Sequence, residues 1–314
     1  MTFLSILFAL IAEQYKPVEK GHWIRRLSQA WLDFVVRNID SGTERSGRLA
    51  CLTAFFPPVI LVLGVHILLL SMQPLLAFAW NILIVYFYLG FRQFSHSFTA
   101  IHEALLERNL ELARTILAEW QGDGINTDTM TESEVIRLAL ERAIVGSHRH
   151  VFGVIFWFML PLGPAGVVLY RLADLASECW PSHASASLGQ AARKFFHAID
   201  WLPTRLTAIG FAIVGNFEDA IYAWRFHLRK WANELEAVIL AAGAGAIGVR
   251  LGSPLPEPDS DEALRMAEAG EPPVIDIGAE ASVRSMRSAV GLVWRAVILW
   301  LVLIALMTIS VWLG

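Results

Sequence analysis

Three long runs of uncharged residues constrain this chain more than any other feature of its sequence. The runs cover residues 50–70, 74–90 and 296–314, and they are 21, 17 and 19 positions long. A helix of about 20 apolar residues is long enough to cross the hydrocarbon core of a bilayer. The sequence therefore predicts an integral membrane protein.

The composition supports this prediction and narrows the class of protein. Hydrophobic residues make up 55% of the 314 residues, charged residues make up 17%, and the mean hydropathy is +0.51. These values are typical of a protein with several membrane helices and sizeable polar segments. The net charge of -4 gives no reason to expect a nucleic-acid partner. The two cysteines, Cys51 and Cys179, are too few for a disulfide framework and match no zinc or redox spacing.

Hydrophobic periodicity predicts helices throughout the chain and gives no sign of a strand. Residues 91–120 have the pattern of one amphipathic helix, with an apolar stripe formed by Phe94, Phe98, Ile101, Leu105, Leu112 and Ile116. Thr131, followed by acidic residues, predicts the start of a further helix that runs to Ile144. We therefore expect an all-α polytopic fold with about four to six membrane helices, one of them broken by proline and glycine.

We expect a single membrane domain over residues 1–314. Its segments, in chain order, are a basic helical block (1–49), a membrane hairpin (50–90), an amphipathic helical block (91–150), broken or re-entrant membrane segments with a polar cluster (151–252), an acidic loop and linker (253–295) and a C-terminal membrane helix (296–314). Basic residues flank the hairpin, so the positive-inside rule places both helical blocks in the cytoplasm. The apolar N-terminal run lacks the flanks of a signal peptide, and we expect it to be retained.

Two of these segments have unusual sequences: one is broken by proline and glycine, and the other is strongly acidic. Residues 151–170 are uncharged but contain Pro161, Gly163, Pro164 and Gly166. A helix that breaks at membrane depth is tolerated only where it packs against protein or lines water. A re-entrant hairpin and a single span are equally compatible with this pattern. Residues 253–282 hold eight acids against one base, which predicts a mobile acidic loop.

One glycine motif resembles a nucleotide-binding sequence but lacks its context. Gly243, Gly245 and Gly248 match the pattern GxGxxG at the end of an apolar stretch. A dinucleotide site needs a strand before this pattern and a helix after it, and neither is predicted here. Small residues at helical spacing let membrane helices approach closely, so we interpret these glycines as packing residues. The sequence also lacks a GxxxxGK[ST] phosphate-binding loop.

Several polar residues beside the apolar runs are candidates for binding a ligand. Arg149 offers a planar fork of donors to a phosphate or carboxylate, although a basic cap at the membrane interface, formed by residues 147–150, is the simpler interpretation. Asp200 and Arg205 flank a predicted Trp-Pro turn, and an ion pair that fixes this turn is the simpler interpretation there. Arg171 and Asp174 lie three residues apart on a predicted helix and are expected to pair.

The full set of ligand candidates is chosen by charge and by position beside the apolar runs. Asn216 and Glu218 end an apolar run and are expected to face the same polar cavity as the Asp200–Arg205 pair. Alternation along the chain keeps His148 and His150 off one helix face, so we predict no metal site and assign no catalytic residue. The candidates are Glu141, His148, Arg149, His150, Arg171, Asp174, Asp200, Arg205, Asn216 and Glu218.

A series of short motifs between residues 105 and 252 carries a family resemblance. They are Glu134-x-x-Arg137-x-x-x-Glu141, Phe156-Trp157, Gly163-Pro164-x-Gly166, Leu169-Tyr170-Arg171, Trp201-Leu202-Pro203-x-Arg205-Leu206 and Gly248-Val249-Arg250-Leu251-Gly252. In these motifs the chain resembles the CobD/CbiB family, the adenosylcobinamide-phosphate synthases of cobalamin biosynthesis. It also resembles AmpE, a distant relative that is linked to β-lactamase induction.

The resemblance implies a multi-pass protein of the bacterial inner membrane, and it departs from the synthases at one stretch. Such a synthase joins the carboxylate of adenosylcobyric acid to an aminopropanol phosphate, using ATP and Mg²⁺. The synthases resemble one another in an acidic Glu-Asn-x-x-Asp-Gly stretch, and here the aligned residues are Val145, Gly146, Arg149 and His150. Arginine and histidine do not replace carboxylates as ligands of Mg²⁺. An arginine eight residues before Trp157 is instead an AmpE feature.

Two functions compete on this basis. The preferred one is a non-catalytic, AmpE-like role in envelope or cell-wall signalling, because the acidic motif is missing from a retained scaffold. The alternative is a divergent adenosylcobinamide-phosphate synthase, and only this alternative calls for ATP and Mg²⁺. A transporter would suit the broken segment, but the chain shows no matching halves. The expected partners are the lipid bilayer and either a cobamide precursor or a cell-wall-derived ligand, and homo-oligomerisation is left open.

Overall fold

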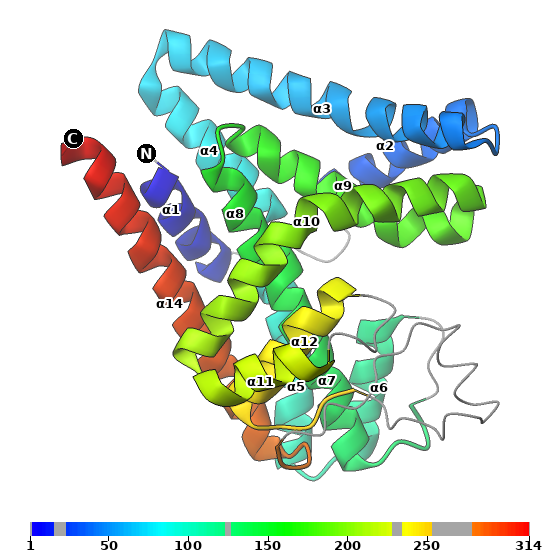
Figure 1. Ribbon diagram of the computed structural model, residues 1–314, viewed down its shortest axis with the longest axis vertical. Coiled ribbons are helices and arrows are strands. Elements are labelled where there is room, and N and C mark those ends of the chain that lie inside the picture. Colours follow the sequence, from blue (N-terminus) through cyan, green and yellow to red (C-terminus); the bar gives the residue numbers. More distant parts are fainter. Residues whose placement is uncertain (1, 16–22, 123–126, 228–233, 253–277, 314) are drawn as a thin grey trace. The chain divides into compact units, whose positions relative to one another are not determined.

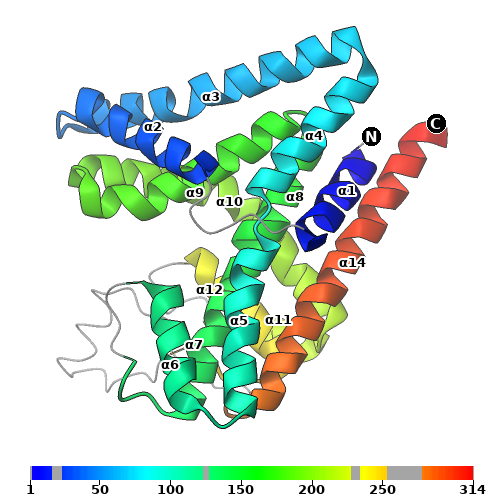
Figure 2. The same cartoon turned by 180° about the vertical axis from the view of Figure 1, so that it is seen from behind.

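The computed structural model describes residues 2–15, 23–122, 127–227, 234–252 and 278–313, and these are almost entirely helical (Figure 1). Figure 2 shows the same helices from behind. The one β contact among the described residues is an isolated bridge between Val249 and Ala279. The predicted all-α fold is confirmed over this part of the chain. Most of the acidic loop predicted at 253–282 lies outside the described residues.

The chain forms two compact units that are interleaved along the sequence. The first unit comprises Met1–Gln93, Arg149–Pro203 and Ile304–Gly314, and the second comprises Phe94–His148 and Thr204–Leu303. The prediction of a single membrane domain is not tested by this division and stays a prediction.

The first unit is built around the predicted membrane hairpin. Its elements are α1 (Thr2–Tyr15), α2 (Trp23–Ile39), α3 (Glu44–Met72), α4 (Pro74–Tyr88), the π-helical turn η1 (His148–Phe152) from Arg149 onward, α8 (Gly153–Met159), α9 (Pro164–His183) and the first part of α10 (Ala186–Val214). A capping box between Thr43 and Ser46 starts α3, and Gln73 separates it from α4, where Pro74 begins the next helix. The predicted hairpin is therefore confirmed as two packed helices joined at one residue.

Aromatic side chains fill the core of the first unit between α3, α9 and α10. The Phe55 ring stacks on Phe195 at a centroid distance of 4.8 Å and on Trp180 at 6.1 Å. Trp180 and Phe55 are almost fully buried. Stacked rings of this kind contribute about 0.5–1.5 kcal/mol beyond the burial of their surface. These contacts fix α9 and α10 beside the long helix α3.

The predicted break in residues 151–170 is confirmed. Helix α8 ends at Met159, and α9 begins at Pro164 after Gly163, whose φ of +52° favours glycine. A methyl group at Gly166 would lie 2.5 Å from the Trp157 carbonyl oxygen, so the two short helices approach too closely for a larger residue there. The break lets α9 fold back against α8, with which it packs.

Helix α10 corrects the predicted Trp-Pro turn, because the helix runs through Pro203 without interruption. Proline removes the hydrogen bond that the carbonyl four residues earlier would accept. In this structure the carbonyl is that of Ile199, and the indole nitrogen of Trp157 donates to it at 3.3 Å. A side chain from α8 thus supplies the donor that the proline lacks.

The second unit contains the amphipathic helices and two small-residue helices. Its elements are α5 (Phe91–Leu106), α6 (Leu110–Gln121), α7 (Glu132–Ser147), the second part of α10, α11 (Phe217–His227), α12 (Glu234–Ile247) and most of α14 (Val283–Leu313). A capping box between Thr131 and Glu134 starts α7, as predicted. The helix runs three residues beyond the expected end at Ile144.

The prediction of one helix over residues 91–120 is wrong. Arg108 has a φ of +59°, and the Asn109 side chain accepts a hydrogen bond from the Leu112 backbone N–H, so a new helix begins at Leu110. This break shifts the buried face of α6 to Ala113 and Leu117, and Leu112 becomes exposed. The N-cap asparagine separates two helices whose hydrophobic patterns look like one continuous pattern in the sequence.

Two helices are long and apolar enough to cross a membrane. They cover Arg45–Met72 and Val283–Ser310, and three shorter apolar helices cover Thr2–Tyr15, Pro74–Tyr88 and Leu235–Ile247. Only 17% and 33% of the most apolar windows of the two long helices are buried. The core helix of a soluble protein would bury these side chains, so their exposure indicates a membrane protein. The expected number of four to six spans stays a prediction.

Gly243 and Gly245 of the GxGxxG pattern are packing residues, as predicted. Gly248 is not, because nothing lies within 4 Å of a methyl group at that position, and its φ of +71° favours glycine for conformational reasons. A methyl group at Gly245 would lie 2.6 Å from the Cα of Ala220 on α11 and would collide with the Asp219 carbonyl. A methyl group at Gly243 would lie 3.0 Å from the Ile144 side chain on α7. The small residues of α12 therefore let it approach the backbone of α11 and the Ile144 side chain of α7 closely.

This packing predicts that Gly245→Ala destabilises the protein by about 1–3 kcal/mol, because backbone atoms of α11 must move. Gly64→Ala is the matched control, since nothing lies within 4 Å of a methyl group at that position of α3. Thermal unfolding of the detergent-solubilised chain, followed by tryptophan fluorescence, compares the two variants. Equal unfolding midpoints for both variants would contradict the close packing.

Candidate functional site

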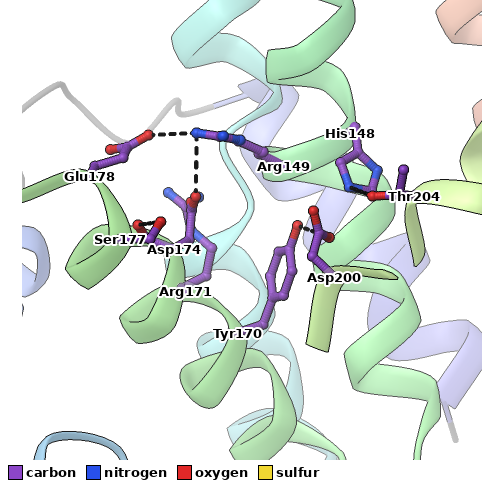
Figure 3. A network of polar contacts seen from close by, with 9 residues as sticks. All are labelled: His148, Arg149, Tyr170, Arg171, Asp174, Ser177, Glu178, Asp200 and Thr204. Atoms are coloured by element: carbon purple, nitrogen blue, oxygen red, sulfur yellow. Dashed lines mark hydrogen bonds and ion pairs between the residues drawn. The ribbon is translucent and has the colours of Figure 1, made fainter. Parts of the chain in front are cut away.

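The ten predicted ligand-binding residues divide equally between the two units. The first unit holds Arg149, His150, Arg171, Asp174 and Asp200. The second holds Glu141, His148, Arg205, Asn216 and Glu218. In the first unit the structure brings Arg149, Arg171 and Asp174 into one network, which also includes Glu178 (Figure 3). We call these four residues the charge cluster.

Arg149 enters the charge cluster from the π-helical turn η1. Its Nη1 atom lies 2.9 Å from Glu178 Oε1 and 3.7 Å from Asp174 Oδ1, so it stands between two carboxylates of α9 (Figure 3). The guanidinium also lies 5.7 Å from the centroid of the Phe196 ring. π-helical turns are rare and occur frequently at functional sites.

Arg171 and Asp174 form the ion pair that their spacing predicts. Arg171 Nη1 lies 2.6 Å from Asp174 Oδ2. Glu178 was not predicted as a site residue, although it lies one helical turn beyond Asp174, where a residue shares the same helix face. That spacing was the signal that sequence reasoning missed.

Asp174 is the buried centre of the charge cluster. Its exposed fraction is 4%, whereas the Glu178 side chain is 47% exposed. Burial, followed by repulsion from Glu178, raises the pKa of Asp174 from 3.8 to about 6, although Arg171 and Arg149 act in the opposite direction. Its Oδ1 atom accepts no hydrogen bond from the described residues. This oxygen is inaccessible to solvent, and its ion-pair partner Arg149 Nη1 lies 3.7 Å away.

Tyr170 and Asp200 form a second polar contact in the same unit. The Tyr170 hydroxyl donates to Asp200 Oδ1 at 3.0 Å, and both side chains are buried. A methyl group at Gly153 would collide with the Tyr170 ring, so the glycine makes room for this hydroxyl. Tyr170 was noticed only as part of a family motif. The predicted ion pair between Asp200 and Arg205 stays a prediction.

In the second unit His148 is buried and bonded to threonines of α10. Its Nδ1 lies 2.9 Å from Thr207 Oγ1, and its Nε2 lies 3.3 Å from Thr204 Oγ1. Its exposed fraction is 2%, so this residue does not act as the surface cap that residues 147–150 were expected to form. The neighbouring His150 is half-buried, in the first unit.

Glu141 holds in place the segment that follows α12, which ends at Gly252. Its Oε1 accepts from the Gly252 backbone N–H at 2.6 Å, while Arg137 Nη1 donates to the Gly252 carbonyl at 2.7 Å. Arg250 donates from Nε to the Gly278 carbonyl at 3.0 Å. This fixed segment, residues 248–252 and 278–279, gives Glu141 a structural role that its charge alone did not reveal.

Asn216 and Glu218 are exposed at the start of α11. The Asn216 amide donates to Asp219 Oδ2 at 2.6 Å and accepts from the Asp219 backbone N–H at 3.3 Å. These bonds are those of a local helix cap. The expectation that they face the same polar cavity as Asp200 and Arg205 stays a prediction.

The charge cluster does not fit a bound Mg²⁺. Its two carboxylates, Asp174 and Glu178, both face the Arg149 guanidinium, which stands where a cation would bridge them. Across the described ranges, no group of three or more His, Cys, Asp or Glu side chains is placed to hold a metal ion. The charge cluster therefore lacks the arrangement of oxygen ligands that Mg²⁺ requires.

The difference in burial between the two carboxylates predicts unequal costs of removing them. Asp174→Ala leaves two guanidiniums without their buried partner and should cost about 3–5 kcal/mol of stability. Glu178→Ala removes a half-exposed partner of Arg149 and should cost less than about 1 kcal/mol. Denaturant or thermal unfolding of both variants measures the difference, and equal losses would show that Asp174 is not the buried centre.

The raised pKa of Asp174 predicts a dependence of stability on pH. Between pH 3.8 and about 6 the folded chain holds a proton on Asp174 that the unfolded chain has released. The contribution of this group to stability is therefore complete below pH 3.8 and is lost as the pH rises through about 6. Asp174→Asn should remove this fall from a plot of unfolding midpoint against pH between about 4 and 7. An unchanged slope in the variant would contradict the assignment.

Comparison of the sequence with known proteins identifies the family of this chain. Residues 3–256 match the family described as CobD/Cbib protein. The chain is 31% identical over 235 residues to the cobalamin biosynthesis protein CobD of Chromobacterium violaceum, covering 74% of this chain and 71% of the relative. It is 29% identical over 238 residues to the protein of that name in Stutzerimonas stutzeri, 75% of each chain. No solved structure matches the chain significantly. The chain belongs to the CobD/CbiB family.

Proposed function

We propose that this protein acts in cobalamin biosynthesis as a multi-pass protein of the bacterial inner membrane, and that its charge cluster binds aminopropanol phosphate. The relatives named cobalamin biosynthesis protein CobD cover about three quarters of the chain and support the pathway. The family resemblance supplies the substrate, because synthases of this family attach an aminopropanol phosphate to adenosylcobyric acid. The geometry of the charge cluster supports a binding site for such a molecule there.

The observation that carries the proposal is the unbonded Oδ1 of buried Asp174 beside two guanidiniums. Aminopropanol phosphate has an ammonium group at one end and a phosphate at the other. The ammonium donates to Asp174 Oδ1, which lacks a hydrogen bond in the described structure. The phosphate accepts from Arg149 and Arg171, whose planar forks match phosphate oxygens.

Glu178 is the group that the ligand phosphate must displace from Arg149. It is half-exposed and pairs with Arg149 at 2.9 Å. An exposed ion pair contributes at most about 1 kcal/mol, so a phosphate displaces the Glu178 carboxylate at little cost. Asp174, which is buried and held by Arg171, stays in place and receives the ammonium. The charge cluster thus contains one carboxylate that stays in place, Asp174, and one that the ligand can displace, Glu178.

A second candidate function is an AmpE-like role in the envelope without synthase chemistry. It is favoured by the charge reversal at the acidic stretch of the family, where Arg149 now stands and is neutralised by Glu178 and Asp174. In that case the same residues serve the fold or bind a cell-wall-derived ligand. The two functions differ in whether the cluster recognises aminopropanol phosphate.

Calorimetry with the full chain in nanodiscs tests the proposal. The wild type should bind aminopropanol phosphate, and Arg171→Gln should weaken binding by about tenfold or more, because a charge-assisted bond to the phosphate is lost. Arg193→Gln is the matched control, since Arg193 is an exposed arginine on α10 outside the cluster.

Aminopropanol and inorganic phosphate, each tested alone, complete the comparison. Each should bind more weakly than the joined molecule, because each engages only one half of the cluster. Absence of binding to the wild type, or equal effects of the two arginine substitutions, would overturn the assignment and favour the envelope role.

A further inference from the structure

The joint between α4 and α5 is buried, and its backbone donors depend on partners from other helices. Leu89, Gly90 and Phe91 are all buried, and the start of α5 as far as Gln93 belongs to the first unit. The first N–H groups of a helix have no acceptor within that helix. Because the joint is buried, its N–H groups need acceptors from elsewhere in the protein.

Two acceptors from distant segments of the first unit meet at this joint. Glu13, near the end of α1, accepts through Oε1 from the Arg92 backbone N–H at 3.1 Å. The His150 carbonyl of η1 accepts from the Gly90 N–H at 3.3 Å. The two bonded N–H groups flank Phe91. The joint therefore connects the side chain of Glu13 to the turn that carries Arg149.

The Arg92 side chain strengthens the contact between α1 and α5. Its Nη1 atom donates to the Gln14 carbonyl at 3.3 Å, so bonds between the two helices run in both directions. The Glu13 carboxyl group lies at the start of α5, where the helix dipole favours a negative charge. Helix α1 also packs against α4, which leads into the joint (Figure 2). Glu13 thus ties the start of α5 to the end of α1.

Glu13 is a costly side chain at this position. Its exposed fraction is 1%, and its Oε2 atom accepts no hydrogen bond from the described residues. A buried carboxyl group with an unbonded oxygen is unfavourable, and an apolar side chain of similar size would avoid this cost. Stability alone does not account for an acid here. The bond to Arg92, and what that bond holds in place, gives a better explanation.

We propose that Glu13 is a positioning residue for the charge cluster: it fixes the start of α5, so that the Gly90 N–H holds the π-helical turn from which Arg149 extends. The inference rests on the proposed function, because it concerns the binding of aminopropanol phosphate by that cluster. Arg149 directly precedes His150, so a shift of the His150 carbonyl moves the guanidinium as well. A guanidinium binds phosphate through bonds of fixed direction, and a small displacement weakens them.

Calorimetry with aminopropanol phosphate and the full chain in nanodiscs tests the proposal. Glu13→Leu should weaken binding by about tenfold, because the contact of one guanidinium with the phosphate is lost. Glu13→Gln should bind within about twofold of the wild type, because its amide oxygen still accepts from the Arg92 N–H. Gln14→Leu is the matched control, since it introduces the same side chain at an exposed neighbour and keeps the backbone carbonyl.

A double-mutant cycle separates positioning from a general loss of structure. In an Arg149→Gln background, Glu13→Leu should change the affinity by less than about twofold, because the group that Glu13 positions is already absent. In an Arg193→Gln background the loss of about tenfold should persist. Equal losses in both backgrounds, or wild-type affinity of Glu13→Leu, would overturn the proposal. If unfolding midpoints show that Glu13→Leu does not fold, Glu13→Met, which is unbranched like glutamate, takes its place.

Hydrogen exchange distinguishes a failure of this inference from a failure of the proposed function. In Glu13→Leu, but not in Gln14→Leu, the amides of residues 89–92 and 149–152 should exchange faster than in the wild type. Faster exchange in a chain that binds no aminopropanol phosphate would support positioning by Glu13 and overturn the proposed function. Unchanged exchange would overturn positioning by Glu13, whether or not the wild type binds the ligand.

Discussion

The burial of the Asp174 carboxylate between two guanidiniums is the interaction on which the candidate site depends. A charged group in a largely apolar helical unit is tolerated only with partners, and Arg171 and Arg149 supply them from the same helix and from η1. Asp174 is buried, and its ion pairs with Arg171 and Arg149 hold both guanidiniums beside it. Glu178, which is half-exposed, adds a fourth charge that can exchange.

Irregular helices make this arrangement possible. The π-helical turn η1 carries Arg149 toward α9, and the break at Gly163 folds α9 back on α8. Pro203 would leave the Ile199 carbonyl without a donor, and the Trp157 indole supplies one. In an apolar environment an unpaired carbonyl is costly, so each irregularity must be matched by a nearby polar group or a glycine.

The sequence predicted the parts of the fold that depend on local pattern. Uncharged runs located α3 and α14, a capping box located the start of α7, and helical spacing predicted the Arg171–Asp174 pair. One error was local, because the Asn109 cap divides the expected helix over residues 91–120. Other errors arose where a distant residue decides the outcome. Continuation of α10 through Pro203 depends on Trp157, which is 42 residues away from its acceptor Ile199 in sequence. The pairing of Arg149 with Glu178 likewise joins helices that the sequence cannot place side by side.

The central claim is that the charge cluster serves the attachment of aminopropanol phosphate in cobalamin biosynthesis. The most direct test is rescue of a bacterial strain that lacks this step, with cobinamide phosphate measured by mass spectrometry. The account predicts that the wild-type chain restores cobinamide phosphate and that Arg171→Gln, at equal abundance in the membrane, does not. Absence of the product with a well-expressed, membrane-inserted wild-type chain would contradict the account and direct the search to envelope phenotypes.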